Sequence, residues 1–156
     1  MAATSGAYNL VRPSTTTSTA ITIEQVTVPA GTMIEIVRAW VNQSTITTSA
    51  GTRVQLLRKS GVATVTSTNP ALLGIGMQAS KCVGGASATG LTATAEGTDS
   101  TVFVEEGFNI VGNGWWYLPV PEERIYLINA SVGLKFPTAP TSAGYVSGIE
   151  WLEFAS

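Results

Sequence analysis

The sequence of 156 residues contains no histidine, one cysteine and one aspartate. Without histidine it has no Ser-His-Asp or Cys-His catalytic site, and it lacks the imidazole that most protein metal sites use. The single cysteine, Cys82, excludes an intramolecular disulfide and a cysteine-rich zinc site, and we expect it to be a small buried hydrophobic residue. We therefore predict that the protein is not an enzyme and binds no metal ion or other cofactor.

Charged residues are also scarce. Eight Lys and Arg residues against ten Asp and Glu residues give a net charge of −2, and 12% of the chain is charged, about half of the 25% that is usual in soluble domains. No run of basic residues indicates a nucleic-acid surface, and no apolar run approaches the ~20 residues of a membrane span. Because the mean hydropathy is +0.26, we expect a protein partner to cover part of the surface.

Two adjacent carboxylate pairs are the remaining candidates for chemistry, Glu105–Glu106 and Glu122–Glu123. A glycosidase needs two carboxylates that face each other across a cleft, whereas neighbours on a strand point to opposite faces. We interpret both pairs as solvated turn residues or as ion-pair partners of Arg124.

Apolar residues alternate with polar ones along most of the chain, and Gly, Pro, Asn and Ser interrupt the pattern, which is typical of short β-strands. The only segment in which we allow one short turn of helix is residues 71–80. The candidate strands are residues 8–12, 20–28, 33–42, 53–59, 62–67, 91–95, 101–105, 115–118, 124–128, 132–136 and 145–154.

Two of these segments carry further information. In residues 20–28 the apolar positions change parity, which predicts a β-bulge near Glu24 and Gln25. In residues 33–42 both faces are apolar, with Ile34, Ile36 and Trp40 on one and Val37, Ala39 and Val41 on the other. This pattern predicts a central strand that is covered on both sides.

The series of short strands without intervening helices predicts an all-β fold, an antiparallel β-sandwich of the jelly-roll type. We assign residues 20–156 to one sandwich domain and residues 1–19 to an extended N-terminal arm, because the arm is rich in Ser, Thr and Ala. Within the arm, Tyr8, Leu10 and Val11 form a short apolar patch beside Arg12. We expect the arm to become ordered only against a partner, with Arg12 paired to a carboxylate of that partner.

The aromatic run Trp115, Trp116 and Tyr117 is the second candidate interface. Because side chains alternate along a strand, at least one of the two tryptophans should point away from the core. Three interpretations are open: one ring closes the end of the sandwich while a proline turn half covers the other, the cluster anchors a protein partner, or it stacks on a sugar.

Several runs resemble sequences from small structural proteins of tailed bacteriophages. They are residues 1–8, 37–40, 53–59, 94–98, 106–109, 118–124 and 133–136, and they extend over nearly the whole length. In style they are similar to the head-decoration or cement proteins that coat phage capsids. The resemblance implies a β-rich subunit, often trimeric, bound outside the capsid at junctions between capsomers. It includes no site motif, so it assigns no residue a role.

Two functions therefore stay open. The first is a structural virion protein, made in the host cytoplasm, that binds the major capsid protein on the capsid exterior and stabilises the particle. The alternative is a carbohydrate- or receptor-binding jelly-roll module of a phage tail or fibre. For the first we expect a homotrimer, built through the face of residues 33–42 and through residues 69–99, a middle segment rich in Gly, Ala, Ser and Thr. The reasons are the apolar residues on both faces of residues 33–42, the low charge, and the small number of lysines that would guard strand edges. In neither case do we expect nucleic-acid or membrane binding.

Overall fold

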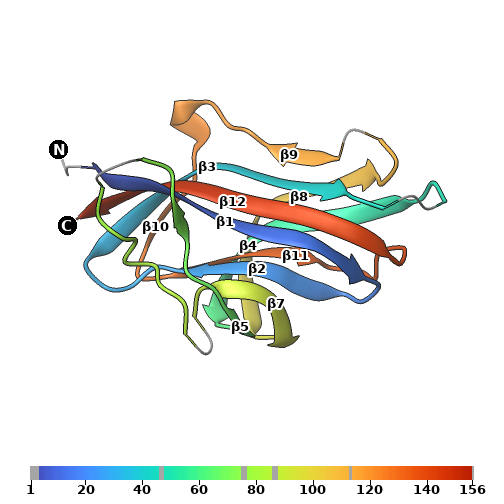
Figure 1. Cartoon of the computed structure of the whole chain (residues 1–156), viewed down its shortest axis with the longest axis horizontal. Coiled ribbons are helices and arrows are strands. Elements are labelled where there is room, and N and C mark those ends of the chain that lie inside the picture. The colour runs from blue at the N-terminus through green and yellow to red at the C-terminus, as the bar shows by residue number, and fades with distance from the viewer. Residues whose placement is uncertain (1–3, 46–47, 75–76, 86–87, 113, 156) are drawn as a thin grey trace.

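The structure, a computed structural model, describes residues 4–45, 48–74, 77–85, 88–112 and 114–155. Two antiparallel sheets pack face to face, with sheet A above sheet B in Figure 1. Sheet A has the order β10 (Tyr126–Ile128), β3 (Thr32–Gln43), β12 (Ala143–Ala155), β1 (Thr4–Thr17) and β6 (Ala71–Leu72), and β9 (Trp115–Tyr117) also pairs with β3. Sheet B has the order β5 (Thr64–Ser67), β7 (Gly90–Ala95), β2 (Ile21–Thr27), β11 (Ser131–Phe136), β4 (Gly51–Gly61) and β8 (Thr98–Asn109).

The order of the long strands is that of a jelly roll. Strands β1, β12, β3 and β9/β10 lie side by side in one sheet, and β2, β11, β4 and β8 lie side by side in the other. The chain passes from sheet A to sheet B and back with each step from β1 to β4, as two interlocked Greek keys require. The all-β sandwich expected from the sequence is confirmed. In the part of the chain that the structure describes, the helical segment is a 3-10 turn, η1 (Pro121–Glu123). The one short helical turn allowed in residues 71–80 is not present in residues 71–74 and 77–80, which form β6 and irregular chain, and residues 75–76 lie outside the described residues.

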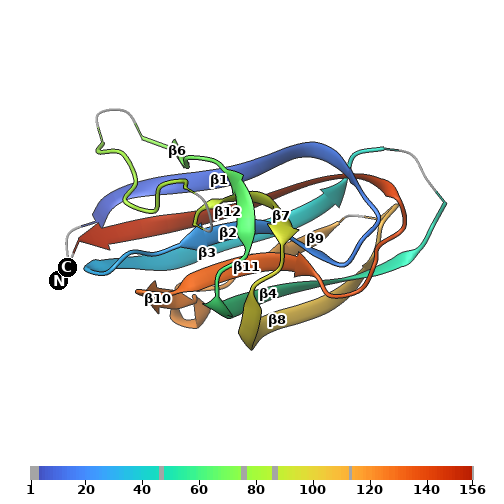
Figure 2. The same ribbon diagram turned by 90° about the horizontal axis from the view of Figure 1, so that it is seen from below.

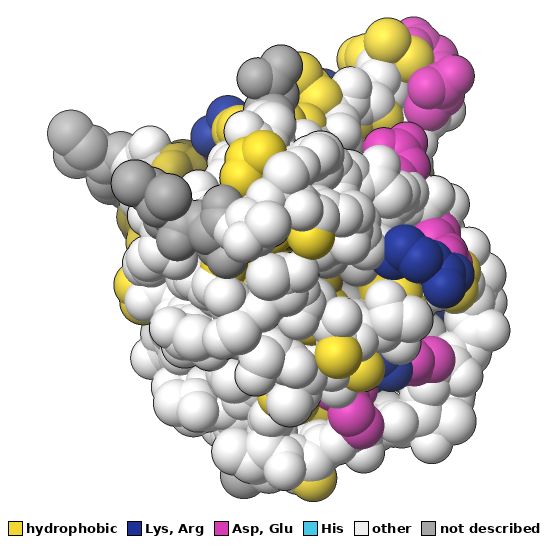
Figure 3. All heavy atoms as spheres, turned by 90° about the vertical axis from the view of Figure 1, so that its right-hand side faces the viewer, with side chains coloured by type: hydrophobic (Ala, Val, Ile, Leu, Met, Phe, Trp, Pro, Cys, Tyr) yellow, Lys and Arg dark blue, Asp and Glu magenta, His cyan; other side chains and the backbone are white. Residues whose placement is uncertain are grey.

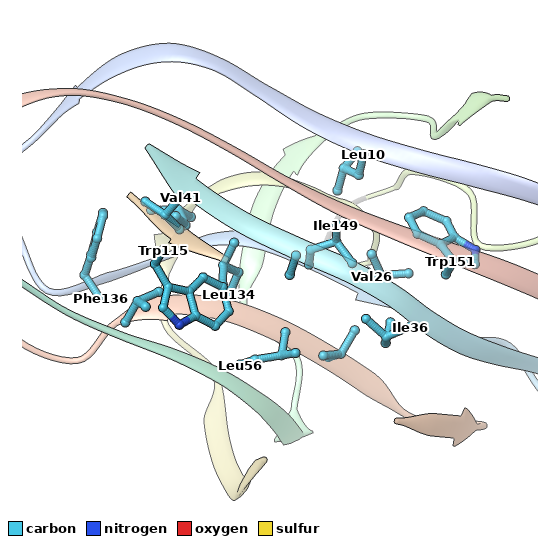
Figure 4. Packing of buried hydrophobic residues seen from close by; sticks show 14 of the residues in the cluster. Leu10, Val26, Ile36, Val41, Leu56, Trp115, Leu134, Phe136, Ile149 and Trp151 are labelled. Atoms are coloured by element: carbon cyan, nitrogen blue, oxygen red, sulfur yellow. The ribbon is translucent and has the colours of Figure 1, made fainter. Parts of the chain in front are cut away.

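The core lies between the two sheets. Leu10, Ile149 and Trp151 enter it from sheet A and Leu56 and Leu134 from sheet B, and each is at most 1% exposed (Figure 4). Burial of each such side chain contributes about 1.5–3 kcal/mol relative to leaving it in water. The period of two predicted this inward set because alternate residues of a strand share a face.

Two β-bulges shift this alternation. In β2, Thr22 pairs with Lys135 and Glu24 with Leu134, so Ile23 is the extra residue, and the bulge expected near Glu24 is confirmed one residue earlier. In β3 the extra residue is Val37. Ile36 and Ala39 consequently both point into the core, and the expected division of residues 33–42 into two apolar faces is wrong.

The N-terminal segment is not a free arm, and this expectation is corrected. Residues 4–17 form β1, which pairs along its length with β12 and, at Tyr8 and Asn9, with β6. Tyr8, Leu10 and Arg12 face into the sandwich and are at most 1% exposed, whereas Val11 faces outward. The segment therefore supplies a central strand of the fold.

Arg12 is held inside the protein by oxygen atoms of neutral groups. Its Nε donates to Thr92 Oγ1 at 2.8 Å, its Nη1 to the Tyr145 carbonyl at 3.1 Å, and its Nη2 to Thr17 Oγ1 at 2.9 Å. These bonds satisfy a buried guanidinium that would otherwise be very costly to desolvate. The expected ion pair between Arg12 and a partner's carboxylate is therefore wrong.

A carboxyl group lies buried next to Arg12. Glu24 Oε1 accepts hydrogen bonds from Ser147 Oγ at 2.5 Å and from the Arg12 backbone N–H at 3.3 Å. Its Oε2 atom is buried without a hydrogen-bond partner. Burial raises the pKa of Glu24 to about 8, and the two hydrogen bonds and the charge of Arg12 only partly offset this effect.

Sheet B is closed on its outer side by a bent two-stranded ribbon, residues 51–67 paired with residues 90–109. The ribbon begins as β4 and β8, turns, and continues as β5 and β7, and β7 pairs with β2 on the far side of β11. In Figure 2, which views the molecule from that side, the ribbon crosses in front of β2 and β11. Gln25 and Lys59, which point outward from sheet B, are buried beneath it.

We predict that Glu24 makes the protein less stable as pH rises. A carboxyl whose pKa is raised on folding stabilises the native state fully below its unfolded pKa of about 4.5, and this contribution is lost as pH rises through about 8. The free energy of unfolding, from urea titrations at pH 5 to 8, should fall by up to about 1.4 kcal/mol per pH unit. In E24Q, which cannot ionise, this fall should disappear.

The matched control is E150Q, because Glu150 lies on the outer face of sheet A, beside Arg38. This variant should keep the wild-type slope between pH 5 and 8. An unchanged slope in E24Q would show that the Glu24 carboxyl does not control the pH dependence.

Candidate functional site

The structure separates the seven candidate interface residues into two groups. Tyr8, Leu10, Arg12 and Trp115 are buried inside the sandwich. Val11 is 45% exposed and Trp116 is 49% exposed, both on the outer side of sheet A, and Tyr117 is half-buried at the edge of that sheet. The seven residues do not form one site, but the exposed ones lie on the same sheet.

The two adjacent tryptophans point in opposite directions, as their alternation predicted. Trp115 lies in the core (Figure 4), where its Nε1 donates to Glu106 Oε2 at 3.1 Å. Trp116 stacks on Trp40 of β3, with ring centroids 5.9 Å apart and ring planes 18° apart. Arg38 also lies over the Trp40 ring, with its Cζ 5.0 Å from the ring centroid.

A row of outward side chains crosses four strands of sheet A at this level. Val11 pairs with Gly148, Gly148 with Trp40, and Trp40 with Trp116. A Cβ atom on Gly148 would overlap the Trp40 indole, so the ring lies across β12 where the glycine leaves room. The missing side chain of Gly148 therefore makes the tryptophan pair and Val11 part of one surface.

Two further rows of outward side chains extend this surface toward β10. One contains Ala7, Leu152, Glu35 and Tyr126, and the other contains Phe154, Met33 and Ile128. The outer face of sheet A consists of the outward residues of β1, β12, β3, β9 and β10, namely Ala7, Asn9, Val11, Val146, Gly148, Glu150, Leu152, Phe154, Met33, Glu35, Arg38, Trp40, Asn42, Trp116, Tyr126 and Ile128. Its most exposed members beside Trp116 are Tyr126 at 53% and Ile128 at 61%.

The charges on the outer face of sheet A are paired with one another. Arg38 Nε binds the Glu150 carboxylate, and Arg124 Nη1 lies 2.7 Å from Glu35 Oε1. Arg124 thus pairs with β3 and not with the neighbouring Glu122 and Glu123. The face is apolar with internally neutralised charges, which lowers the cost of removing it from water.

A groove of about 470 Å³ continues the outer face around the sheet edge, between β8 and the segment from β9 to η1. Its lining residues are Phe103, Val104, Glu106, Trp116, Tyr117, Leu118, Pro119, Glu123 and Ile125. The Tyr117 hydroxyl donates to the Glu123 carbonyl at 3.2 Å, and burial raises the pKa of Tyr117. Figure 3 shows hydrophobic and acidic side chains together on the projecting corner that this segment forms.

The remaining candidate groups for chemistry are engaged or dispersed. Glu105 binds Arg53 and accepts from Gln55 Nε2 at 2.5 Å, whereas Glu106 turns to Trp115. Cys82 is buried, and desolvation together with the charge of Glu153 raises the pKa of its thiol. Among residues 4–155, apart from the undescribed positions, no three His, Cys, Asp or Glu side chains form a group that could hold a metal ion. The described helical segment is too short to cross a membrane.

Sequence reasoning missed Trp40, Gly148, Tyr126 and Ile128 as members of the outer face. The signal that joins them is the strand register, in which Gly148 stands opposite Trp40 and Tyr126 opposite Glu35. Register across β3 and β12 depends on pairing between segments about a hundred residues apart, which alternation within one strand does not reveal.

Comparison of the chain with family models, with curated proteins and with solved structures finds no match.

We predict that G148A disrupts the outer face of sheet A. The added methyl group overlaps the Trp40 ring, so the ring must move, and overpacking of this kind costs about 1–3 kcal/mol. The near-ultraviolet circular dichroism of the Trp40–Trp116 pair should change, and the urea midpoint should fall.

G51A is the matched control, because a Cβ on Gly51 of β4 would meet nothing within 4 Å. It should leave the aromatic spectrum as it is. Wild-type spectrum and stability in G148A would contradict the role assigned to this glycine.

Proposed function

We propose that the protein is a structural virion protein that binds the outside of a phage capsid and stabilises it, and that it docks through the outer face of sheet A. The observation that carries this proposal is the row Val11, Gly148, Trp40 and Trp116. This row places apolar side chains across four strands of sheet A, and Val11 and Trp116 at its ends are exposed to water. Contiguous exposed apolar area of this kind is typical of protein interaction sites.

The outer faces of the two sheets differ in how far the chain itself covers them, and this difference supports docking through sheet A. The ribbon of residues 51–67 and 90–109 covers the middle of sheet B and buries Lys59 and Gln25. In the part of the chain that the structure describes, no second layer of strands covers β1, β12 and β3, and the outward residues Val11, Trp40 and Leu152 are exposed or half-buried. A face that extends over β1, β12, β3, β9 and β10 suits a large protein surface better than it suits a small ligand.

Three further considerations agree with a capsid partner. Jelly rolls include viral capsid domains as well as lectins, although a fold alone does not decide a function. The runs that resemble phage decoration proteins lie on both sheets, and the scarcity of unpaired charge fits a subunit that is partly covered in its assembled state. The same proposal makes the major capsid protein the partner, the virion exterior the location, and a homo-oligomer, with a trimer expected, the working form.

One observation favours the alternative, a carbohydrate- or receptor-binding module of a tail or fibre. Trp116 is 49% exposed beside Trp40, and an exposed indole presents a flat surface on which a sugar could stack. The amide of Asn42 lies on the same face. We rank this second because the apolar surface extends through Tyr126 and Ile128, well beyond the tryptophan pair.

We predict that V11N weakens binding to particles that lack the protein at least tenfold, equivalent to about 1.4 kcal/mol. Val11 is exposed at the start of the row, so an amide there must be desolvated in the complex while the fold keeps its core. Binding is measured by co-sedimentation of purified protein with stripped particles over a range of concentrations.

V102N is the matched control, because Val102 is equally exposed, at 46%, on β8 of sheet B. It should bind as the wild type does. Equal binding of V11N and wild type would refute docking through sheet A, and a loss confined to V102N would place the contact on β8.

A further inference from the structure

A second depression, separate from the outer face of sheet A, lies at one end of sheet B. Its volume is about 570 Å³, within the usual range of ligand pockets, about 300–1,000 Å³. The lining residues, which we call the Arg58 pocket, are Thr27, Val28, Arg58, Lys59, Ser60, Val62, Ser100, Thr101, Asn129, Ala130 and Ser131. The ends of β2, β11, β4 and β8 thus meet at one site.

Five of the eleven residues that line the Arg58 pocket carry a hydroxyl group. Thr27 Oγ1 and Ser131 Oγ are hydrogen-bonded to each other at 3.0 Å, and Ser100 Oγ donates to the Arg58 carbonyl at 3.1 Å. Each hydroxyl that donates one bond keeps acceptor capacity for a second partner. The Thr101 side chain has no hydrogen-bond partner among the described residues, so it is free to donate as well as to accept.

The side-chain amide of Asn129 joins these hydroxyls through a left-handed turn. Asn129 has a φ of 45°, in the left-handed region that asparagine adopts more readily than most residues. It stands between β10 and β11, and this turn brings it into the pocket wall. Its side chain likewise has no hydrogen-bond partner in the part of the chain that the structure describes, so both its donor and its acceptor atoms are available.

The charge of the Arg58 pocket is positive although the protein carries −2 overall. Lys59 is fully buried and bound to Asp99 at 2.7 Å, and Asp99 also binds Lys135 at 2.6 Å. Arg58 is exposed and forms no ion pair with any described residue. Its guanidinium is therefore the available cation, with the fork geometry that binds a carboxylate through two hydrogen bonds.

We propose that the Arg58 pocket binds a hexuronate, the carboxylated sugar unit of an acidic saccharide. Arg58 holds the carboxylate, and the hydroxyls of Thr101, Ser60 and Ser131 with the amide of Asn129 bind the ring hydroxyls. A lone carboxylate would occupy only the guanidinium and leave this polar wall unused. A nucleic acid would need a run of cations, and the pocket has one available.

This site goes beyond the proposed function, because no residue of the outer face of sheet A lines it. Capsid binding and sugar binding can therefore fail independently. A saccharide site on sheet B would leave sheet A free for a protein partner.

The test is a titration of the full chain with D-glucuronate, followed by two-dimensional amide NMR, with D-glucose and acetate as separate probes. We expect saturable shifts at the amides of Arg58, Thr101 and Asn129 with glucuronate, and at least tenfold weaker binding of glucose and of acetate. R58A should lose at least tenfold in affinity, and T101V, which replaces the hydroxyl by a methyl of equal size, should lose severalfold.

R53A is the matched control, because Arg53 is the other exposed arginine of β4 but pairs with Glu105 outside the pocket. It should bind glucuronate as the wild type does. Acetate binding as tightly as glucuronate would overturn the sugar assignment and leave a simple anion site. Absence of shifts in the wild type, or an equal loss in R53A and R58A, would overturn the site itself.

Discussion

The bent ribbon of residues 51–67 and 90–109 is the constraint on which the surfaces of this sandwich depend. Its turn is tight: a Cβ on Gly97 would overlap the carbonyl of Gly61, so the two chains approach as closely as only glycine allows. Beneath the ribbon, Gln25 donates to the carbonyls of Ala63 at 3.2 Å and Ala88 at 2.6 Å, and Thr22 binds Glu96. These polar contacts join the ribbon to β2, and sheet B is thereby closed across its middle.

Closure of sheet B leaves sheet A as the broad open face and leaves a polar depression at the end of the covered sheet. The two surfaces differ in chemistry. The outer face of sheet A is apolar and its charges neutralise each other, as between Arg38 and Glu150, whereas the Arg58 pocket is lined by hydroxyls around an unpaired guanidinium. We propose a protein partner for the outer face of sheet A, because removing this face from water costs little free energy. We propose an acidic sugar for the Arg58 pocket, because its side chains offer many hydrogen-bond donors and acceptors.

The strand pattern and the jelly-roll class could be predicted from alternation alone, and so could the bulge in β2 and the opposite directions of Trp115 and Trp116. The place of β1 could not. Its Ser- and Thr-rich composition resembles a free arm, but Arg12 finds its oxygen partners on Thr92 and Tyr145, 80 and 133 residues away. The bulge at Val37 likewise depends on pairing with β12. Contacts of such sequence separation leave no local signal, and for the same reason the outer face of sheet A emerges only from the register.

The number of copies of the chain in one purified virus particle tests the proposed capsid role most directly. Quantitative mass spectrometry with isotope-labelled peptides of this chain and of the major capsid protein measures the ratio of the two. A protein that coats the capsid through the outer face of sheet A should be present in numbers comparable with those of the capsid protein. A ratio of only a few copies per particle would contradict the capsid role and indicate a component of the tail or fibre.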